Sequence, residues 1–199
     1  STWAARRWRT TSRSWSGWSR LGRMSASLEP MTLEEFLLWE EEQEERFEFD
    51  GIQPIAMTGA SYAHVLLVTR LILALGSRLR AGCVPLANDL KVVTNHRVRY
   101  PDVTVVCTPV APKETRVEPS VVFEVLSPST AMTDKRVKPR DYAAMPSVQA
   151  YAILSQDEPW ATVLRRASGW EVEELEGMAA VLELPEVGAS LPLKELYPE

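Results

Sequence analysis

The stretch that decides the fold is Val121-Val122-Phe123-Glu124-Val125-Leu126-Ser127-Pro128, an apolar run with one carboxylate inside it and a proline at its end. A second run, Tyr100-Pro101-Asp102-Val103-Thr104-Val105-Val106, repeats the pattern with Asp102 near its start. Short runs rich in β-branched residues are typical of buried strands. A buried carboxylate destabilises the fold unless it is paired or holds a metal. Glu124 and Asp102 are therefore the first candidates for a functional site.

The two acids can meet at one end of a sheet if their strands are neighbours. Two carboxylate ligands suit Mg²⁺ or Mn²⁺, ions that keep several waters and accept phosphate oxygens. A metal held by Asp102 and Glu124 could activate water and stabilise the charge that develops during phosphodiester hydrolysis. On these residues alone, a second interpretation is equally open. Asp102 would then cap a strand, and Glu124 would pair with an arginine.

Length and composition indicate one soluble domain. The chain has 199 residues, of which 45% are hydrophobic and 25% charged, enough for a good core. Its longest apolar run, around residues 65–75, is too short to cross a membrane, so we expect no membrane association. Cys83 and Cys107 lie in different segments without metal-ligand spacing, which predicts free thiols and a cytoplasmic location. With two histidines in the chain, a metal is expected on oxygen ligands.

Residues 1–28 differ from the rest of the chain. They hold six arginines, four of the seven tryptophans and no acid, whereas the remainder carries 16 basic and 27 acidic residues. One interpretation is a basic, aromatic arm for nucleic acid or membrane. We favour upstream sequence that precedes the true start, with a single domain over residues 29–199. The acidic body argues against tight passive binding to a polyanion, but not against contact through a local basic strip and a bound cation.

The order of the expected elements predicts the fold class. Thr32-Leu33-Glu34-Glu35 has capping-box spacing and begins a helix that runs to about Glu45. Asp50-Gly51 is typical of a hairpin turn. Further elements follow: a helix at 60–81, strands at 89–94, 99–107 and 120–126, a helix at 134–145, and strands at 149–154, 161–166, 170–175 and 181–184. Pro139 fits the helix expected at 134–145 only in its first turn. The sequence predicts an α/β (α+β-like) fold, a mixed β-sheet flanked by helices with an N-terminal helix and hairpin.

Several segments occur in the order and spacing of a known family. They are Phe47-Glu48-Phe49-Asp50-Gly51, Ser61-Tyr62-Ala63-His64, Asn88-Asp89-Leu90-Lys91-Val92, Tyr100-Pro101-Asp102-Val103, Phe123-Glu124-Val125-Leu126-Ser127-Pro128-Ser129-Thr130, Asp134 with Lys138 and Tyr142, and Tyr151 to Pro159. On these segments the chain from Glu34 to Tyr197 resembles the bacterial Uma-two family of putative restriction endonucleases, within the PD-(D/E)XK nuclease superfamily. The resemblance implies a restriction-endonuclease-like core and a Mg²⁺- or Mn²⁺-dependent endonuclease acting on DNA.

The superfamily motif has a lysine two residues after the second acid, but Leu126 stands at that position. The resemblance implies that the lysine has moved to the following helix, at Lys138. A cation is needed near the attacking water and the scissile phosphate, and a lysine with a lowered pKa could also orient or deprotonate that water. Lys135 is the local competitor for this role. Both lysines could instead belong to a solvated helix face.

Three further residues are candidates for the substrate cleft or the metal cluster. His64 could contact phosphate, or it could make a structural hydrogen bond at the start of its helix. Glu48 could position water as an auxiliary acid, or it could pair with Arg46 or a lysine. Asp89 could support the metal ligands, or it could simply begin a strand.

Two functions from different classes fit these observations. The first is a Mg²⁺-dependent DNA endonuclease that uses Asp102, Glu124, Lys138 and Glu48. The second is a catalytically inactive nuclease-fold module that binds nucleic acid or protein. A homodimer fits the first function, because cutting both strands of a duplex usually needs two sites.

Overall fold

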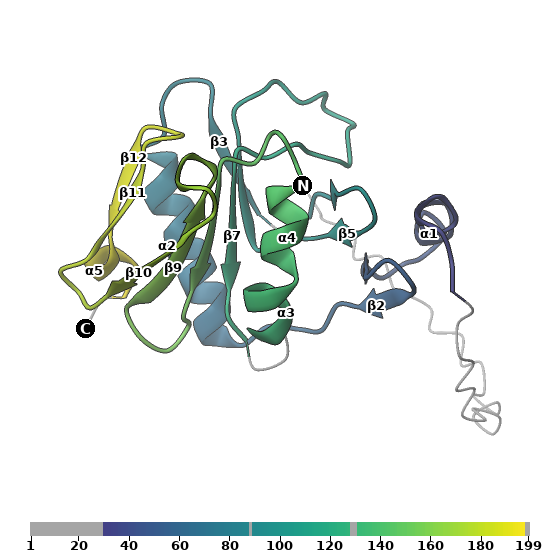
Figure 1. Ribbon diagram of the computed structural model, residues 1–199, viewed down its shortest axis with the longest axis horizontal. Helices are drawn as coiled ribbons and strands as arrows, with labels where there is room; N and C mark the ends of the chain where they lie inside the picture. The colour runs from purple at the N-terminus through teal and green to yellow at the C-terminus, as the bar shows by residue number, and fades with distance from the viewer. Residues whose placement is uncertain (1–29, 88, 128–130, 198–199) are drawn as a thin grey trace, which may run out of the picture.

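A six-stranded mixed sheet forms the centre of the computed structural model, which describes residues 30–87, 89–127 and 131–197 (Figure 1). The extension predicted at residues 1–28 lies outside the described residues. The strand order is β10-β9-β8-β7-β6-β3. The bounds are β3 (Val84–Ala87), β6 (Val103–Val106), β7 (Val121–Val125), β8 (Ala150–Leu154), β9 (Trp160–Arg165) and β10 (Val172–Glu176). β7 and β8 are parallel, and the other neighbouring pairs are antiparallel.

The alternation of side chains along β7 places Glu124 on one face of this sheet. Val121, Phe123 and Val125 belong to the core that includes α2 (Tyr62–Gly76). Val122 packs in the opposite core. Successive strand residues point to opposite faces, so Glu124 shares the face of Val122. Figure 1 shows α2 behind the sheet and α4 in front of it, which is the side that Glu124 faces.

The helix expected at 134–145 is broken into two short helices. They are α3 (Ala131–Arg136) and α4 (Lys138–Ala143), with Val137 between them. Pro139 is the second residue of α4, where its missing N–H costs no helical hydrogen bond. Lys138 is therefore the first residue of a new helix. The residue is buried, with 3% of its surface exposed to solvent.

A second, four-stranded sheet stands beside α3 and α4, in the order β2-β1-β5-β4 (Figure 1). Its strands are β1 (Phe47–Phe49), β2 (Pro54–Ala56), β4 (Val92–Val93) and β5 (Val98–Arg99). α1 (Leu33–Glu40) covers it and begins with the predicted capping box, in which the Thr32 N–H donates to Glu35 at 2.7 Å. Phe36, Phe49 and Val98 form a core of their own here. We call this part of the molecule the small sheet.

The C-terminal segment completes the α2 side of the main sheet. It holds β11 (Val181–Leu184), β12 (Ala189–Pro192) and α5 (Leu193–Leu196), whose buried leucines pack with α2. A short 3₁₀ turn, η1 (Arg166–Ser168), joins β9 to β10 and ends at Gly169 with φ 68°. β12 was not predicted from the sequence. Within the described ranges, every helix is too short or too polar to cross a membrane.

The expectation of free cysteine thiols is wrong, because Cys83 and Cys107 form a disulfide. β3 pairs antiparallel with β6, with Val84 opposite Val106. One position further, the two cysteines lie opposite each other with their Cα atoms 4.0 Å apart. Sequence spacing did not reveal this pair because β3 was not predicted, and without β3 the two cysteines have no common sheet.

Candidate active site

Asp102 and Glu124 meet at the junction of β6 and β7, as the sequence predicted. β6 pairs antiparallel with β7, with Val103 opposite Phe123. Asp102 precedes β6 by one residue, so this register places it opposite Glu124. The N–H of Val125 donates to Asp102 Oδ2 at 2.7 Å, which fixes the carboxylate at the end of β7.

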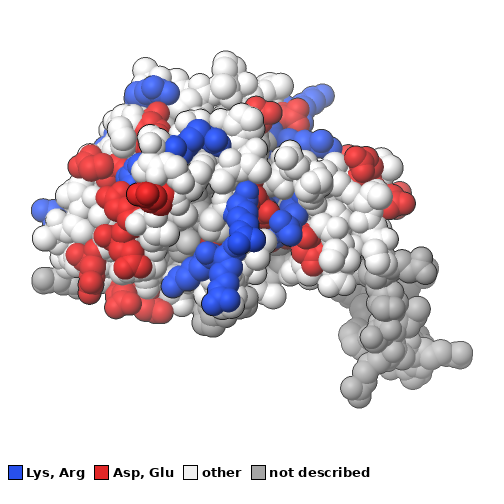
Figure 2. Space-filling model, in the orientation of Figure 1, with Lys and Arg blue, Asp and Glu red and all other residues white. Residues whose placement is uncertain are grey.

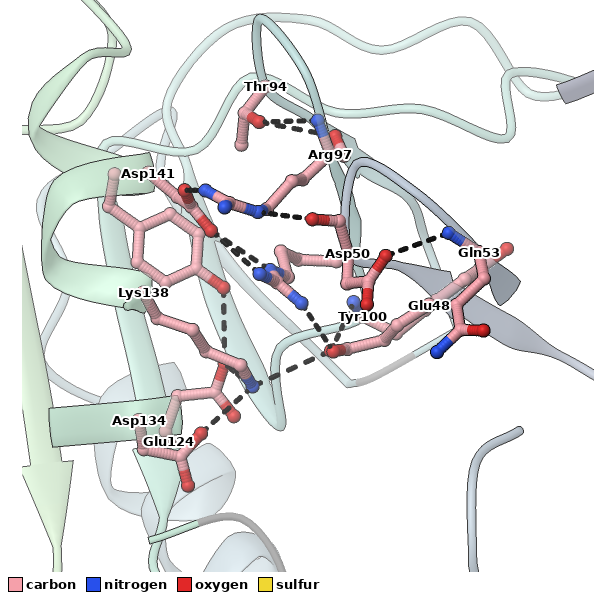
Figure 3. Close-up of polar contacts among 12 residues, drawn as sticks. Glu48, Asp50, Gln53, Thr94, Arg97, Tyr100, Glu124, Asp134, Lys138 and Asp141 are labelled. Atoms are coloured by element: carbon pink, nitrogen blue, oxygen red, sulfur yellow. Dashed lines mark hydrogen bonds and ion pairs between the residues drawn. The ribbon is translucent and has the colours of Figure 1, made fainter. Parts of the chain in front are cut away.

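Glu124 is 4% exposed and belongs to a buried cluster around the Lys138 ammonium (Figure 3). Lys138 Nζ lies 2.7 Å from Glu124 Oε1, 3.0 Å from Asp134 Oδ1 and 3.5 Å from Glu48 Oε1. The Tyr142 hydroxyl donates to the same Glu124 oxygen at 3.1 Å. One cation therefore faces three carboxylates from three elements: β7, α3 and β1.

Arg99 connects this cluster to the small sheet. Its guanidinium donates to Glu48 Oε2 at 2.9 Å and to Asp141 Oδ2 at 2.8 and 3.1 Å. Arg97 donates to the other oxygen of Asp141 at 2.5 Å and to the carbonyl of Asp50 at 2.7 Å. Asp141 lies one turn after Lys138 on α4, so both arginines fasten the small sheet to the helix that carries the lysine (Figure 3).

The crowding of acids shifts the pKa values of the central pair. Burial raises the pKa of Glu124 well above its usual value against the opposing effect of Lys138, and nearby Asp102, Asp134 and Glu48 raise it further. Burial lowers the pKa of Lys138, but Glu124, Glu48 and Asp134 outweigh burial and raise it overall. Lys138 is therefore a permanent cation. A lysine that deprotonates water would need a lowered pKa, and the three carboxylates around Lys138 shift its pKa in the opposite direction.

His64 lies against the other side of Asp102. Its Nε2 is 3.2 Å from Asp102 Oδ2, and its side chain is 12% exposed. The hydrogen bond to Asp102 raises the pKa of His64, while burial opposes that rise. Its Nδ1 is buried without a hydrogen-bond partner among the described residues. The structural contact proposed for His64 is thus made with Asp102, whereas its contact with phosphate stays a prediction.

Two candidates lie outside the cluster. Asp89 pairs with Arg46 at 3.1 Å and its side chain is 75% exposed, so its environment is that of a surface ion pair. The Lys135 ammonium lies 4.9 Å from the ring centroid of Trp160, away from the carboxylates that surround Lys138. Glu48 does form an ion pair, but with Arg99 and Lys138 instead of Arg46.

Sequence reasoning missed several members of the cluster. They are Arg99 and Asp141, together with the roles of Asp134 and Tyr142, which were named only as part of the family resemblance and not as partners of Lys138 and Glu124. Asp134 stands four residues before Lys138, a spacing at which side chains meet on one helix face, so this pair could have been found. Arg99 carried no such local signal. Its two partners are 51 and 42 residues away in the chain.

The oxygen atoms that remain suit a hard cation. Within the described part of the chain, Asp102 Oδ1 and Glu124 Oε2 accept no hydrogen bond, while their partner oxygens do. A site of one or two carboxylates completed by water is what Mg²⁺ accepts. No group of three or more metal-binding side chains is preformed in the described ranges. The carboxylates gathered here also outnumber the fixed cations, which favours an added cation: Glu48, Asp102, Glu124, Asp134 and Asp141 stand against Arg97, Arg99 and Lys138.

The chain is similar to known proteins over most of its length. Residues 33–194 match the Uma2 family, described as putative restriction endonuclease. The chain belongs to the Uma2 family. The protein slr1290 of Synechocystis sp. (strain ATCC 27184 / PCC 6803 / Kazusa) is 34% identical over 179 residues, which cover 87% of this chain and 94% of the relative.

A solved structure shares the fold of this Uma2 chain. It is that of a putative nuclease belonging to DUF820 from Anabaena variabilis ATCC 29413. The match has a TM-score of 0.69 at 19% identity and covers 84% of this chain and 98% of the other. The predicted family and the predicted restriction-endonuclease-like fold are thereby confirmed, and family and fold together indicate a nuclease of this type.

Proposed function

We propose that this chain is a Mg²⁺- or Mn²⁺-dependent endonuclease that hydrolyses DNA phosphodiester bonds. Asp102 and Glu124 would hold the metal, Lys138 would be the catalytic cation, and Glu48 would orient that lysine. The observation that carries the proposal is the position of Lys138 Nζ, 2.7 Å from Glu124, which faces Asp102 across the β6–β7 junction. We infer that this helical lysine takes the role of the lysine that the strand motif would carry at Leu126.

The side chains of this chain divide the chemistry between them. A bound divalent ion would supply an activated water and would neutralise charge on the scissile phosphate. Lys138 stays protonated because three carboxylates raise its pKa, so it stabilises negative charge and does not abstract a proton. Tyr142 and Lys138 both bind Glu124 Oε1, so Oε2 would be the oxygen that holds a metal ion. Asp102 is held in the same way through Oδ2 by Val125.

The proposal is tested on supercoiled plasmid DNA with Mg²⁺ or Mn²⁺. Asp102→Asn is expected to reduce cleavage by at least about 100-fold, equivalent to about 2.7 kcal/mol in the activation barrier. Asp89→Asn is the matched control, because it makes the same change at an exposed ion pair outside the cluster, and its cleavage should equal that of the wild type. Calorimetry should show metal binding in the wild type that is lost in Asp102→Asn. Unchanged cleavage in Asp102→Asn, or no metal binding by the wild type, would contradict the proposal.

The inactive binding module remains a second proposal, and one observation favours it. Lys138 is saturated by three carboxylates, so its charge is already neutralised before any phosphate arrives. Metal binding and nucleic-acid binding without turnover on duplex DNA, single strands or RNA would support this module over the enzyme. A homodimer is proposed for the enzyme alone, and light scattering of the purified chain tests it.

A further inference from the structure

The described lysines and arginines differ in whether a carboxylate neutralises them. Of the 16 lysines and arginines after residue 29, seven form ion pairs with other described residues, namely Arg46, Arg78, Lys91, Arg97, Arg99, Lys138 and Arg165. Three of those that form no ion pair with a described residue are Lys135, Arg136 and Arg140, which stand within six consecutive positions. We call these three residues the basic strip. They concentrate unneutralised positive charge on a body that is otherwise acidic.

The basic strip belongs to the same two helices that hold the site. Along α3 and α4 the buried positions are Asp134, Lys138, Asp141 and Tyr142, a helical spacing of four, three and one that faces the sheet. The strip residues are exposed on the outer side of these helices. Figure 2 shows a blue strip at the centre of this face, where Figure 1 places α3 and α4, with acidic side chains gathered to its left.

The strip and the site lie within reach of one polynucleotide. An α-helix with its side chains is about 10 Å across, which is about three base-pair steps of duplex. A backbone whose scissile phosphate meets Lys138 therefore passes the strip within a few nucleotides. The acidic edge strand β10, with exposed Glu174 and Glu176, repels phosphates on the far side and favours a path along α3 and α4.

We propose that the basic strip binds the sugar–phosphate backbone of the polynucleotide substrate beside the site. The inference rests on the proposed function, since it assigns the path of that substrate. The contact is electrostatic and independent of base sequence, because cations that bind phosphate groups read no base edges. Within the strip, the Lys135 ammonium also lies over the ring of Trp160, and this contact restricts its position.

The test compares two triple variants that remove the same net charge. The strip variant is Lys135→Gln, Arg136→Gln and Arg140→Gln. The control variant is Lys113→Gln, Arg116→Gln and Lys194→Gln, all of them exposed and outside ion pairs among the described residues. Binding of a labelled DNA duplex is measured by fluorescence anisotropy over a salt series, and circular dichroism checks the fold of each protein.

The strip variant is expected to bind more weakly and to lose about 2 to 3 from the slope of log K against log salt concentration, near 0.9 for each lost phosphate contact. The control variant should keep the slope of the wild type. Equal losses in both variants, no loss in the strip variant, or no binding of DNA by the wild type at low salt would each overturn the proposal. A double variant, Arg136→Gln with Arg140→Gln, keeps the Lys135–Trp160 contact and should lose about two thirds of the slope change.

Cleavage measured on the same proteins separates this inference from the proposed function. Strip-dependent binding without cleavage by the wild type would support the basic strip and contradict the nuclease. Cleavage with KM and binding unchanged in the strip variant would support the nuclease and contradict the strip. If both proposals hold, the strip variant raises KM while kcat at saturating DNA stays close to that of the wild type.

Discussion

The molecule buries two clusters built from the same three residue types. In each, a lysine pairs with a glutamate whose carboxylate also accepts a hydrogen bond from a tyrosine hydroxyl. The site cluster is Lys138, Glu124 and Tyr142, and the second, which we call the small-sheet cluster, is Lys91, Glu40 and Tyr100. The ammonium–carboxylate distances are nearly equal, at 2.7 Å and 2.6 Å.

The two clusters differ in the charge around them. Lys91 meets one carboxylate, so the small-sheet cluster is balanced and needs nothing further. Lys138 meets three, with Asp102 close enough to raise the pKa of Glu124 as well. A buried ion pair by itself is therefore no sign of a functional site. The surplus of acids is the feature that distinguishes the site cluster. Arg99 offsets part of it by pairing with Glu48, and the rest is balanced either by a further cation or by protonation of Glu124.

The largest contrast is expected from removing each lysine. Lys138→Met should reduce cleavage by about 100-fold or more, because the cation at the phosphate is lost. Lys91→Met should leave kcat unchanged for the folded fraction. It should also reduce the free energy of unfolding by about 3 to 5 kcal/mol, because Glu40 stays buried without its partner. Cleavage assays and urea denaturation of both variants check this. A cleavage defect in fully folded Lys91→Met protein would contradict the functional difference between the two clusters.

A second contrast concerns the two glutamates in metal-free protein. Glu124→Gln removes a charge from the crowded cluster, so it should not destabilise the fold in EDTA near pH 8. Glu40→Gln weakens a balanced pair and should cost about 2 kcal/mol, within the range for hydrogen bonds to charged groups. Only Glu124→Gln should lose metal binding and cleavage. Urea denaturation in EDTA gives the stabilities, and calorimetry with Mg²⁺ gives the binding.

The raised pKa of Glu124 fixes the pH dependence of this contrast. Its folded pKa lies above its usual value of 4.5, so the folded protein holds this proton more tightly than the unfolded chain. The wild type should therefore lose stability as pH rises from about 4.5 through the folded pKa, and Glu124→Gln should not. The free energy of unfolding of both proteins is measured against pH in EDTA. If it changes with pH in the same way in both, the surplus of acids is absent.

The smallest contrast is between the two tyrosines. Tyr142→Phe and Tyr100→Phe each remove one hydroxyl that donates to a buried carboxylate, so each should cost about 1 to 3 kcal/mol. Tyr142→Phe should also lower the affinity for Mg²⁺ or Mn²⁺, because Glu124 loses one of the donors that hold it in place. Tyr100→Phe should bind metal as the wild type does. Equal metal affinity in both variants would remove Tyr142 from the support of the site.

The sequence predicted the parts of the site that depend on local pattern. The apolar runs around Asp102 and Glu124 gave two adjacent strands, and the register of β6 and β7 brings the acids opposite each other. The helix after β7 was expected as one piece over 134–145, with Pro139 tolerated only in a first turn. The structure meets that condition by dividing the segment into α3 and α4. The side chain of Lys138 reaches Glu124 as the family resemblance implied, although its role in cleavage stays a prediction.

The rest depended on pairings that leave no local trace. Arg99 stands in a two-residue strand, and nothing around it indicates that it bridges Glu48 and Asp141. Asp89 looked like Glu48 in sequence, an acid beside a strand, but it lies at an exposed turn. The Cys83–Cys107 disulfide was missed for the same reason, since it follows from a strand pairing and not from spacing.

The fastening of the small sheet has a consequence for motion. This part has its own apolar core, and its polar attachment to α4 is made by Arg97 and Arg99 on Asp141. Units of this kind open cooperatively at lower free energy than the whole protein. We expect amide hydrogens of β1 and β5 to exchange sooner than those of β7. Each opening would carry Glu48 away from Lys138 and leave Asp102 and Glu124 in place, so the protein would alternate between an assembled and a half-assembled site without unfolding.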